Sequence, residues 1–114
     1  MKNERRNKRV PIVGSATLYL RDKDSIRPMK AMTVDISVSG IGVYSDGPIE
    51  KETSLSVDIT FITSDGSLGT ASVDGTVVFF RKIGNFYFVG IEFGEKLDPR
   101  GQSFLFAEIQ KLLE

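Results

Sequence analysis

The sequence predicts an all-β fold of six antiparallel strands followed by one C-terminal helix. Apolar and polar residues alternate along six segments, turn residues separate these segments, and a helical apolar spacing appears only after Asp98. Because the connections are short, neighbouring strands would pair antiparallel and form a barrel or a sandwich. A chain of 114 residues is long enough for one such domain with a single hydrophobic core.

The strand segments differ in how clearly they alternate. The clearest is 55–61, where large apolar residues alternate with serine, aspartate and threonine. The segment 71–82 is rich in β-branched residues and contains Gly75, which predicts a bulge or bend there. A polar loop is expected from Asp22 to Pro28, and a hairpin turn from Ser64 to Ser67. The complete set of predicted strands is 16–21, 29–37, 40–45, 55–61, 71–82 and 86–93.

The C-terminal segment has the spacing of an amphipathic helix. Asp98 and Pro99 predict its start, with the aspartate as N-cap and the proline at the first helical position. The apolar stripe would pack against an open end or side of the β-structure, with Glu108 and Lys111 on the opposite, polar face. Phe104 falls outside this stripe and hints at an exposed contact. The residues of the stripe are Leu105, Phe106, Ile109, Leu112 and Leu113.

The second predicted strand ends in a polar pair and a glycine turn. Since side chains alternate along a strand, Asp35 and Ser37 would share the outer face beside Gly40. A carboxylate accepts two parallel N–H bonds, which suits the two donors on the Watson–Crick edge of guanine. The alternative is that Asp35 and Ser37 only cap the coming turn. The inner face of this strand would carry Met32, Val34 and Ile36.

Residues 1–9 form a basic arm without apolar periodicity, which predicts a flexible segment ahead of a single domain at 10–114. Five cations and one glutamate give the arm a net charge of +4, and the rest of the chain, with 10 basic and 14 acidic residues, balances it. Arg5 and Arg9 stand four positions apart with Arg6 between them. Guanidinium groups pair with phosphate, fork onto the guanine O6/N7 edge and stack on purines. The alternative is a solvated basic tail.

The composition argues against an enzyme. Cysteine and histidine are absent, which removes thiol catalysis, the commonest metal ligand and the usual general base. The chain has no phosphate-binding or zinc-binding motif, and its acidic residues are scattered. No apolar stretch could span a membrane, and no secretory signal is present. We therefore expect a cytoplasmic binding protein with no catalytic residue, no metal and no cofactor.

The two motifs together, Arg5-x-x-x-Arg9 and then Asp35-x-Ser37-x-x-Gly40, resemble those of the PilZ domain family of bacterial cyclic di-GMP receptors. The resemblance covers the arm, the strands and the final helix, and the VGIEF motif looks like the last strand of the family. It implies a six-stranded antiparallel β-barrel with a C-terminal helix. It also implies that the residues binding cyclic di-GMP are Arg5, Arg9, Asp35, Ser37 and Gly40. Arg6 is a further candidate, and so is Gly90, which is expected to mark a curved or closely approached spot in the last strand.

The mechanism expected from this resemblance is a disorder-to-order switch. Cyclic di-GMP would recruit Arg5 and Arg9, fold the arm across the barrel beside Asp35 and create a surface for an unidentified downstream protein. One or two ligand molecules per chain, and a monomer or a homodimer, are all compatible with it. One alternative is a PilZ-like protein-interaction adaptor that binds no nucleotide. Another is a small barrel that binds single-stranded nucleic acid through its arm; the acidic body argues against it, so no nucleic-acid polymer is expected.

Overall fold

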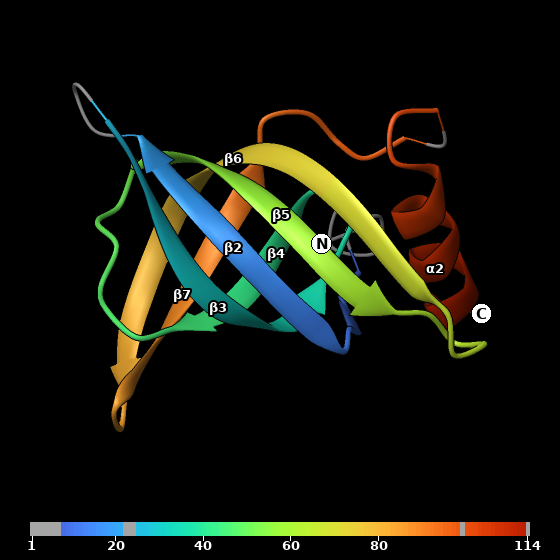
Figure 1. Cartoon of the computed structure of the whole chain (residues 1–114), viewed down its shortest axis with the longest axis horizontal. Coiled ribbons are helices and arrows are strands. Elements are labelled where there is room, and N and C mark those ends of the chain that lie inside the picture. The colour runs from blue at the N-terminus through green and yellow to red at the C-terminus, as the bar shows by residue number, and fades with distance from the viewer. Residues whose placement is uncertain (1–7, 22–24, 99, 114) are drawn as a thin grey trace.

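The fold of the chain is known from a computed structural model, which describes residues 8–21, 25–98 and 100–113. Strands dominate it, and one helix near the C-terminus lies against one end of the β-structure (Figure 1). The elements are β1 (Val10–Pro11), β2 (Gly14–Arg21), β3 (Ile26–Ile36), β4 (Gly40–Ser45), β5 (Ser54–Ile62), β6 (Leu68–Ile83), β7 (Phe86–Phe93) and α2 (Ser103–Leu113).

The strands form an antiparallel barrel of six long strands. They are ordered β1-β3-β2-β5-β6-β7-β4, and β3 also pairs with β4, which closes the sheet on itself. The two-residue strand β1 is an addition to the predicted set and pairs with β3 through Val10 and Ile36. The predicted fold class, an antiparallel barrel with a C-terminal helix, is confirmed.

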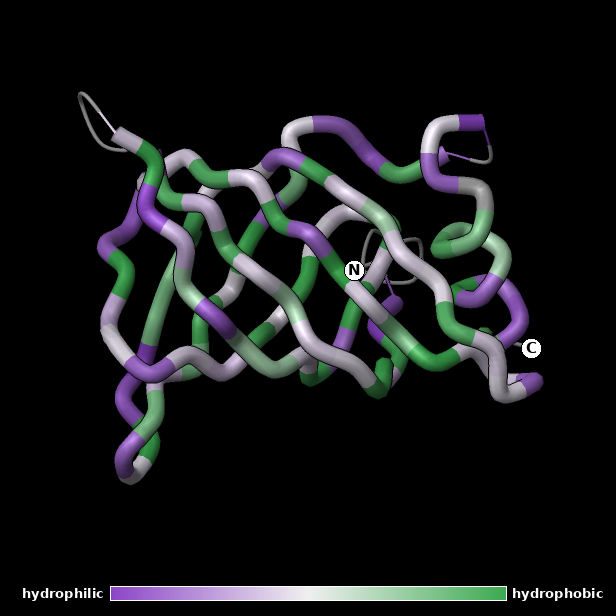
Figure 2. The backbone as a smooth tube through the Cα atoms, viewed as in Figure 1, coloured by the Kyte–Doolittle hydropathy of each residue, from purple (hydrophilic) through white to green (hydrophobic). Residues whose placement is uncertain are grey.

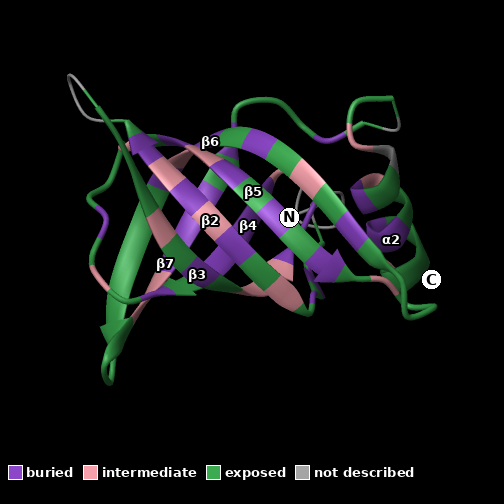
Figure 3. Cartoon of the chain, viewed as in Figure 1, coloured by how far each residue is buried: buried purple, intermediate pink, exposed green. Residues whose placement is uncertain are grey.

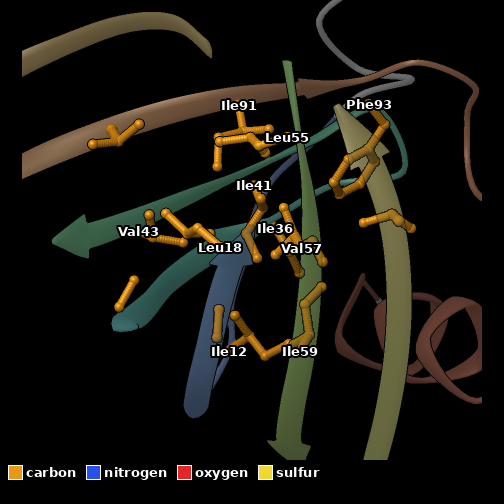
Figure 4. Packing of buried hydrophobic residues seen from close by; sticks show 14 of the residues in the cluster. Ile12, Leu18, Ile36, Ile41, Val43, Leu55, Val57, Ile59, Ile91 and Phe93 are labelled. Atoms are coloured by element: carbon orange, nitrogen blue, oxygen red, sulfur yellow. The ribbon is translucent and has the colours of Figure 1, made fainter. Parts of the chain in front are cut away.

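Alternating apolar residues fill the barrel. Along β5 the predicted inner residues are all buried, and the residues between them are exposed or half-buried (Figures 2 and 3). Figure 4 shows the inward side chains of several strands meeting in one cluster, among them Leu18, Val57 and Ile91. From α2, Leu105 and Ile109 are buried in the same cluster, so the helix covers one end of the core as predicted.

A bulge in β3 changes which of its residues face inward. The pairing of β3 with β4 shifts between Thr33 and Asp35. An extra residue reverses the alternation of a strand, so Ala31 is buried before the bulge and Ile36 after it. Met32, predicted to lie inside with Ile36, is instead 62% exposed, and that prediction is wrong.

Two predicted strand features also differ. Strand β3 begins at Ile26, so part of the loop expected from Asp22 to Pro28 is strand; Pro28 is tolerated there because β3 pairs only with β2 at this point. The bulge in β6 lies between Val77 and Phe79 and not at Gly75. Gly75 instead permits close packing, because a Cβ there would lie 2.7 Å from the carbonyl oxygen of Glu92.

The helix begins later than predicted. The Asp98 carboxylate accepts the backbone N–H groups of Arg100 and Gly101, which caps a turn that precedes the helix. Phe104 is exposed, in agreement with its place outside the apolar stripe. Glu108 was expected on the polar face, but it is only 5% exposed because that side of α2 faces the turn between β5 and β6.

Candidate functional site

Four residues form a row across the outside of the barrel. Asp35 of β3 pairs with Gly42 of β4, Gly42 pairs with Gly90 of β7, and Gly90 pairs with Phe79 of β6. The residues that alternate with them on β4 and β7 are buried in the core, so this row faces outward. Four strands therefore position one outer surface.

The two glycines of this row make room for neighbouring side chains. A Cβ added to Gly42 would lie 2.9 Å from Asp35 Oδ1 and 2.7 Å from Phe88 Cζ, so a carboxylate and an aromatic ring both lie over this glycine. A Cβ at Gly90 would overlap the ring of Phe79. Gly90, expected to mark a closely approached spot, is such a spot, and its neighbour is this ring.

Arg9 joins the row at the Asp35 end. Its Nη1 donates a hydrogen bond to Asp35 Oδ1 at 2.9 Å, and the two side chains form an ion pair. A Cβ added to Gly40 would lie 3.6 Å from Arg9 Nη2, which places the guanidinium beside this glycine. The structure thus brings together three of the residues singled out from the sequence. Arg5 and Arg6 lie outside the described residues.

Ser37 occupies a different position from the one that strand alternation predicted. Strand β3 ends at Ile36, so the alternation does not extend to Ser37, which is 1% exposed. Its Oγ accepts the backbone N–H of Ser39 at 3.1 Å, and its own N–H donates to the carbonyl of Gly40 at 2.9 Å. Ser37 therefore shapes the turn between β3 and β4, and in this structure its hydroxyl does not share the outer face with Asp35.

The chain matches a known protein family. The model of the PilZ domain matches residues 3–111, which is nearly the whole chain and includes most of the arm and most of the helix. The chain belongs to the PilZ domain family. No curated protein matches it. Membership of this family implies either a domain that binds cyclic di-GMP or a PilZ-type adaptor.

The outer face of this PilZ domain also carries aromatic residues that the sequence analysis missed. Phe88 contacts Tyr44 edge-on, with ring centroids 5.7 Å apart, and contacts Phe79 at the same centroid distance. Tyr44 in turn pairs with the exposed Met32. The sequence did contain a signal, since alternation places Phe88 on the same face of its strand as Gly90.

The surface around Asp35 offers three kinds of interaction to a ligand. The carboxylate is a hydrogen-bond acceptor, Arg9 supplies charged donors, and Phe88 with Tyr44 supplies an apolar edge. Within the described ranges, no cluster of acidic side chains could hold a metal ion. In the same part of the chain, no helix has the length and apolar character needed to cross a membrane.

Proposed function

We propose that this PilZ domain is a cyclic di-GMP receptor that binds its ligand at the outer surface around Arg9, Asp35 and Gly40. The observation that carries the proposal is the placement of the Arg9 guanidinium and the Asp35 carboxylate side by side beside Gly40. The cation belongs to one family motif and the carboxylate to the other, and the two are 26 positions apart in the chain.

The chemistry of the pair suits a guanine nucleotide. Asp35 would accept the N–H donors of the guanine Watson–Crick edge, and Arg9 would bind phosphate or the O6/N7 edge of a base. The side chains are 44% and 32% exposed, so both groups are accessible to a ligand. Exposed ion pairs contribute roughly 0–1 kcal/mol, so replacing the pair with ligand contacts costs little.

The arm would complete the site. Arg5 precedes Arg9 by only four residues, so a ligand bound at Asp35 could engage both guanidinium groups. Folding residues 1–9 over the bound ligand would create a new surface, which a downstream protein could recognise. Ser37 would act indirectly by holding the turn that contains Gly40. No cofactor is needed for this function.

Isothermal titration calorimetry with cyclic di-GMP tests the proposal. The variants are Arg9→Ala and Asp35→Ala, the control ligand is GMP, and the matched control variant is Arg21→Ala. Arg21 is also an exposed arginine in an ion pair, with Asp74, but it lies outside the proposed site. We expect saturable binding that Arg9→Ala and Asp35→Ala lose and that Arg21→Ala retains. Equal binding by all the variants would rule out this site.

One observation favours an adaptor that binds no nucleotide. Arg9 and Asp35 form an ion pair with each other in the structure. These motif residues can therefore hold the chain before β1 against β3 without a ligand. The same titration separates the two functions. An absence of binding heat even at high concentrations of cyclic di-GMP would favour the adaptor, provided that circular dichroism shows the protein to be folded.

A further inference from the structure

Strand β6 extends beyond the body of the barrel. Its pairing with β5 ends at Thr76, whereas its pairing with β7 continues to the pair formed by Ile83 and Phe86. Val77 is still bonded to the loop before β5, through Glu52 N–H and Thr53 C=O. Beyond it, 78–83 has no strand partner on that side among the described residues, and Figure 1 shows the β6–β7 hairpin projecting from the barrel. We call residues 78–86 the ribbon.

The ribbon exposes an unusual amount of apolar surface. Five of its large apolar side chains are between 37% and 50% exposed. Open strand edges with exposed apolar residues attract other strands, and proteins that do not use them usually protect them. The bulge after Val77 and the positive charge of Lys82 are features that protect an open strand edge from unwanted pairing. They do not explain why the ribbon exposes large apolar side chains. These side chains are Val78, Phe79, Phe80, Ile83 and Phe86.

The backbone of the ribbon is arranged for pairing. Its turn has Gly84 at φ 61° in the first central position, and the two-residue turn closes on the pair of Ile83 and Phe86. Backbone groups alternate in direction along an antiparallel pair. Counting back from the closing pair, the N–H and C=O groups of Lys82 and Phe80 point away from β7, toward the open edge.

A hollow lies beside this edge. It has a volume of about 460 Å³ and opens at the end of the barrel, between the ribbon and the loop that joins β4 to β5. Apolar side chains contribute about half of its wall, and Phe80 is one of them, so the part beside Phe80 would suit an apolar side chain of a bound segment. Its lining consists of Leu20, Arg27, Pro48, Ile49, Glu50, Thr53 and Phe80.

The charge of the ribbon indicates the kind of partner. Arg81 and Lys82 are its two charged residues, and residues 75–91 contain no acidic side chain. The rest of the chain from residue 10 onward has an excess of acidic residues, so the ribbon itself is cationic in an acidic domain, and Glu50 lies across the hollow from it. An acidic residue in a bound segment would be attracted to it.

We propose that the open edge of β6, 78–83, binds an extended segment of a partner protein by β-strand addition. The segment carries an apolar side chain that enters the hollow beside Phe80 and an acidic residue that pairs with Arg81 or Lys82. Backbone hydrogen bonds supply affinity and the alternating side chains supply specificity. The observations behind this proposal do not depend on cyclic di-GMP binding.

Selection from a random peptide library, with the folded full chain as target, tests the proposal. The peptides enriched are expected to alternate apolar residues and to contain an acidic residue. A synthetic peptide of the enriched sequence should protect the amides of Phe80 and Lys82 from hydrogen exchange. Enrichment of no sequence, or protection confined to other parts of the chain, would overturn the proposal.

Two matched comparisons test the backbone contacts directly. Both Lys82→Pro and Lys82→Ala remove the charged side chain, but only Lys82→Pro also removes the edge-facing backbone N–H. Lys82→Pro should therefore bind the peptide at least about tenfold more weakly than Lys82→Ala. Peptides N-methylated at alternate positions avoid any effect on the fold of the protein. Methylation of the peptide N–H groups that face β6 should abolish binding, and methylation of the alternate N–H groups, which face away, should be tolerated. Equal tolerance of both methylation patterns would exclude strand addition.

Sedimentation equilibrium tests whether the open edge of β6 binds a second copy of this chain instead of a partner protein. A wild-type chain that dimerises, with a Lys82→Pro variant that is monomeric, would mean that a second copy pairs with the edge and would overturn the assignment to a partner protein. A monomeric wild type is the expected result. Vesicles containing anionic lipid serve as the other probe, and their retention of the wild type but not of Arg81→Glu would mean that the ribbon binds a membrane instead.

Discussion

Arg9 Nη1 and Asp35 Oδ1 are 2.9 Å apart, and this ion pair joins the end of the basic arm to the bulged end of β3. The pair places charged donors and an acceptor at one point on the outside of the barrel. Each group is therefore positioned by the other before any ligand arrives, and a ligand that offers both N–H donors and phosphates can take over both partners.

Replacing Arg9 with alanine should affect ligand binding far more than stability. The ion pair is exposed, so its loss should lower the free energy of unfolding by no more than about 1 kcal/mol. Affinity for cyclic di-GMP should fall by at least about tenfold, the effect of losing one charge-assisted hydrogen bond. Urea denaturation and calorimetry on the same preparation measure the two quantities. A loss of stability large enough to unfold the chain would show that Arg9 has a structural role.

Gly42 is the position where a side chain should interfere most directly with the site. A valine there would meet the Asp35 carboxylate and the Phe88 ring, both within 3 Å of the new Cβ, so Gly42→Val should displace them and abolish binding of cyclic di-GMP. Gly47→Ala is the control, because a Cβ at Gly47 has no neighbour within 4 Å. Heteronuclear NMR spectra would show whether the changes in Gly42→Val stay local. Unimpaired binding by this variant would contradict the proposed position of the ligand.

Asp65 should make the stability of the chain depend on pH. The hydroxyl of Thr63, and then the backbone N–H and the side chain of Ser67, lower the pKa of Asp65 below 3.8 in the folded chain. The ionised carboxylate thus stabilises the fold above pH 3.8, and this contribution is lost as the pH falls through the lowered pKa. Asp65→Asn should be less stable than the wild type at neutral pH, with a difference that shrinks in acid. Denaturant titrations at several pH values would reveal it, and a difference that grows in acid would refute it.

The alternation of apolar and polar residues predicted the fold well, because each strand of a closed barrel has one face toward the core and one face outward. Strand β5 shows this pattern most clearly. It failed at Met32 because a bulge reverses the alternation without a residue type that marks it. It failed at Ser37 because strand β3 ends one residue earlier. The structure places Arg9, Asp35 and Gly40 of the two motifs close together without a ligand, whereas the sequence predicted that a ligand would bring Arg9 to Asp35. Their ion pair depends on strand register, which a single sequence does not specify.

Glu108 offers a test of the buried face of α2. Its side chain is 5% exposed and has one hydrogen-bond contact among the described residues, to the hydroxyl of Ser64 at 3.5 Å. A buried carboxylate with so little compensation is unfavourable, so Glu108→Gln should raise the free energy of unfolding by about 1 kcal/mol. The exposed Glu95, changed to glutamine, is the control and should have no effect. A lower stability of Glu108→Gln in urea would show that the negative charge itself is needed.

Ligand binding at Asp35 should change the dynamics of the ribbon. Phe88 lies beside Asp35 over Gly42 and also contacts Phe79, which belongs to the ribbon, so one ring connects the two surfaces. Saturating cyclic di-GMP should therefore change the hydrogen-exchange rates of the ribbon amides. Phe88→Leu keeps apolar bulk but removes the ring contacts, and it should reduce this response even at concentrations that saturate the variant. If the response to ligand persists undiminished in Phe88→Leu, the two surfaces are coupled by another route.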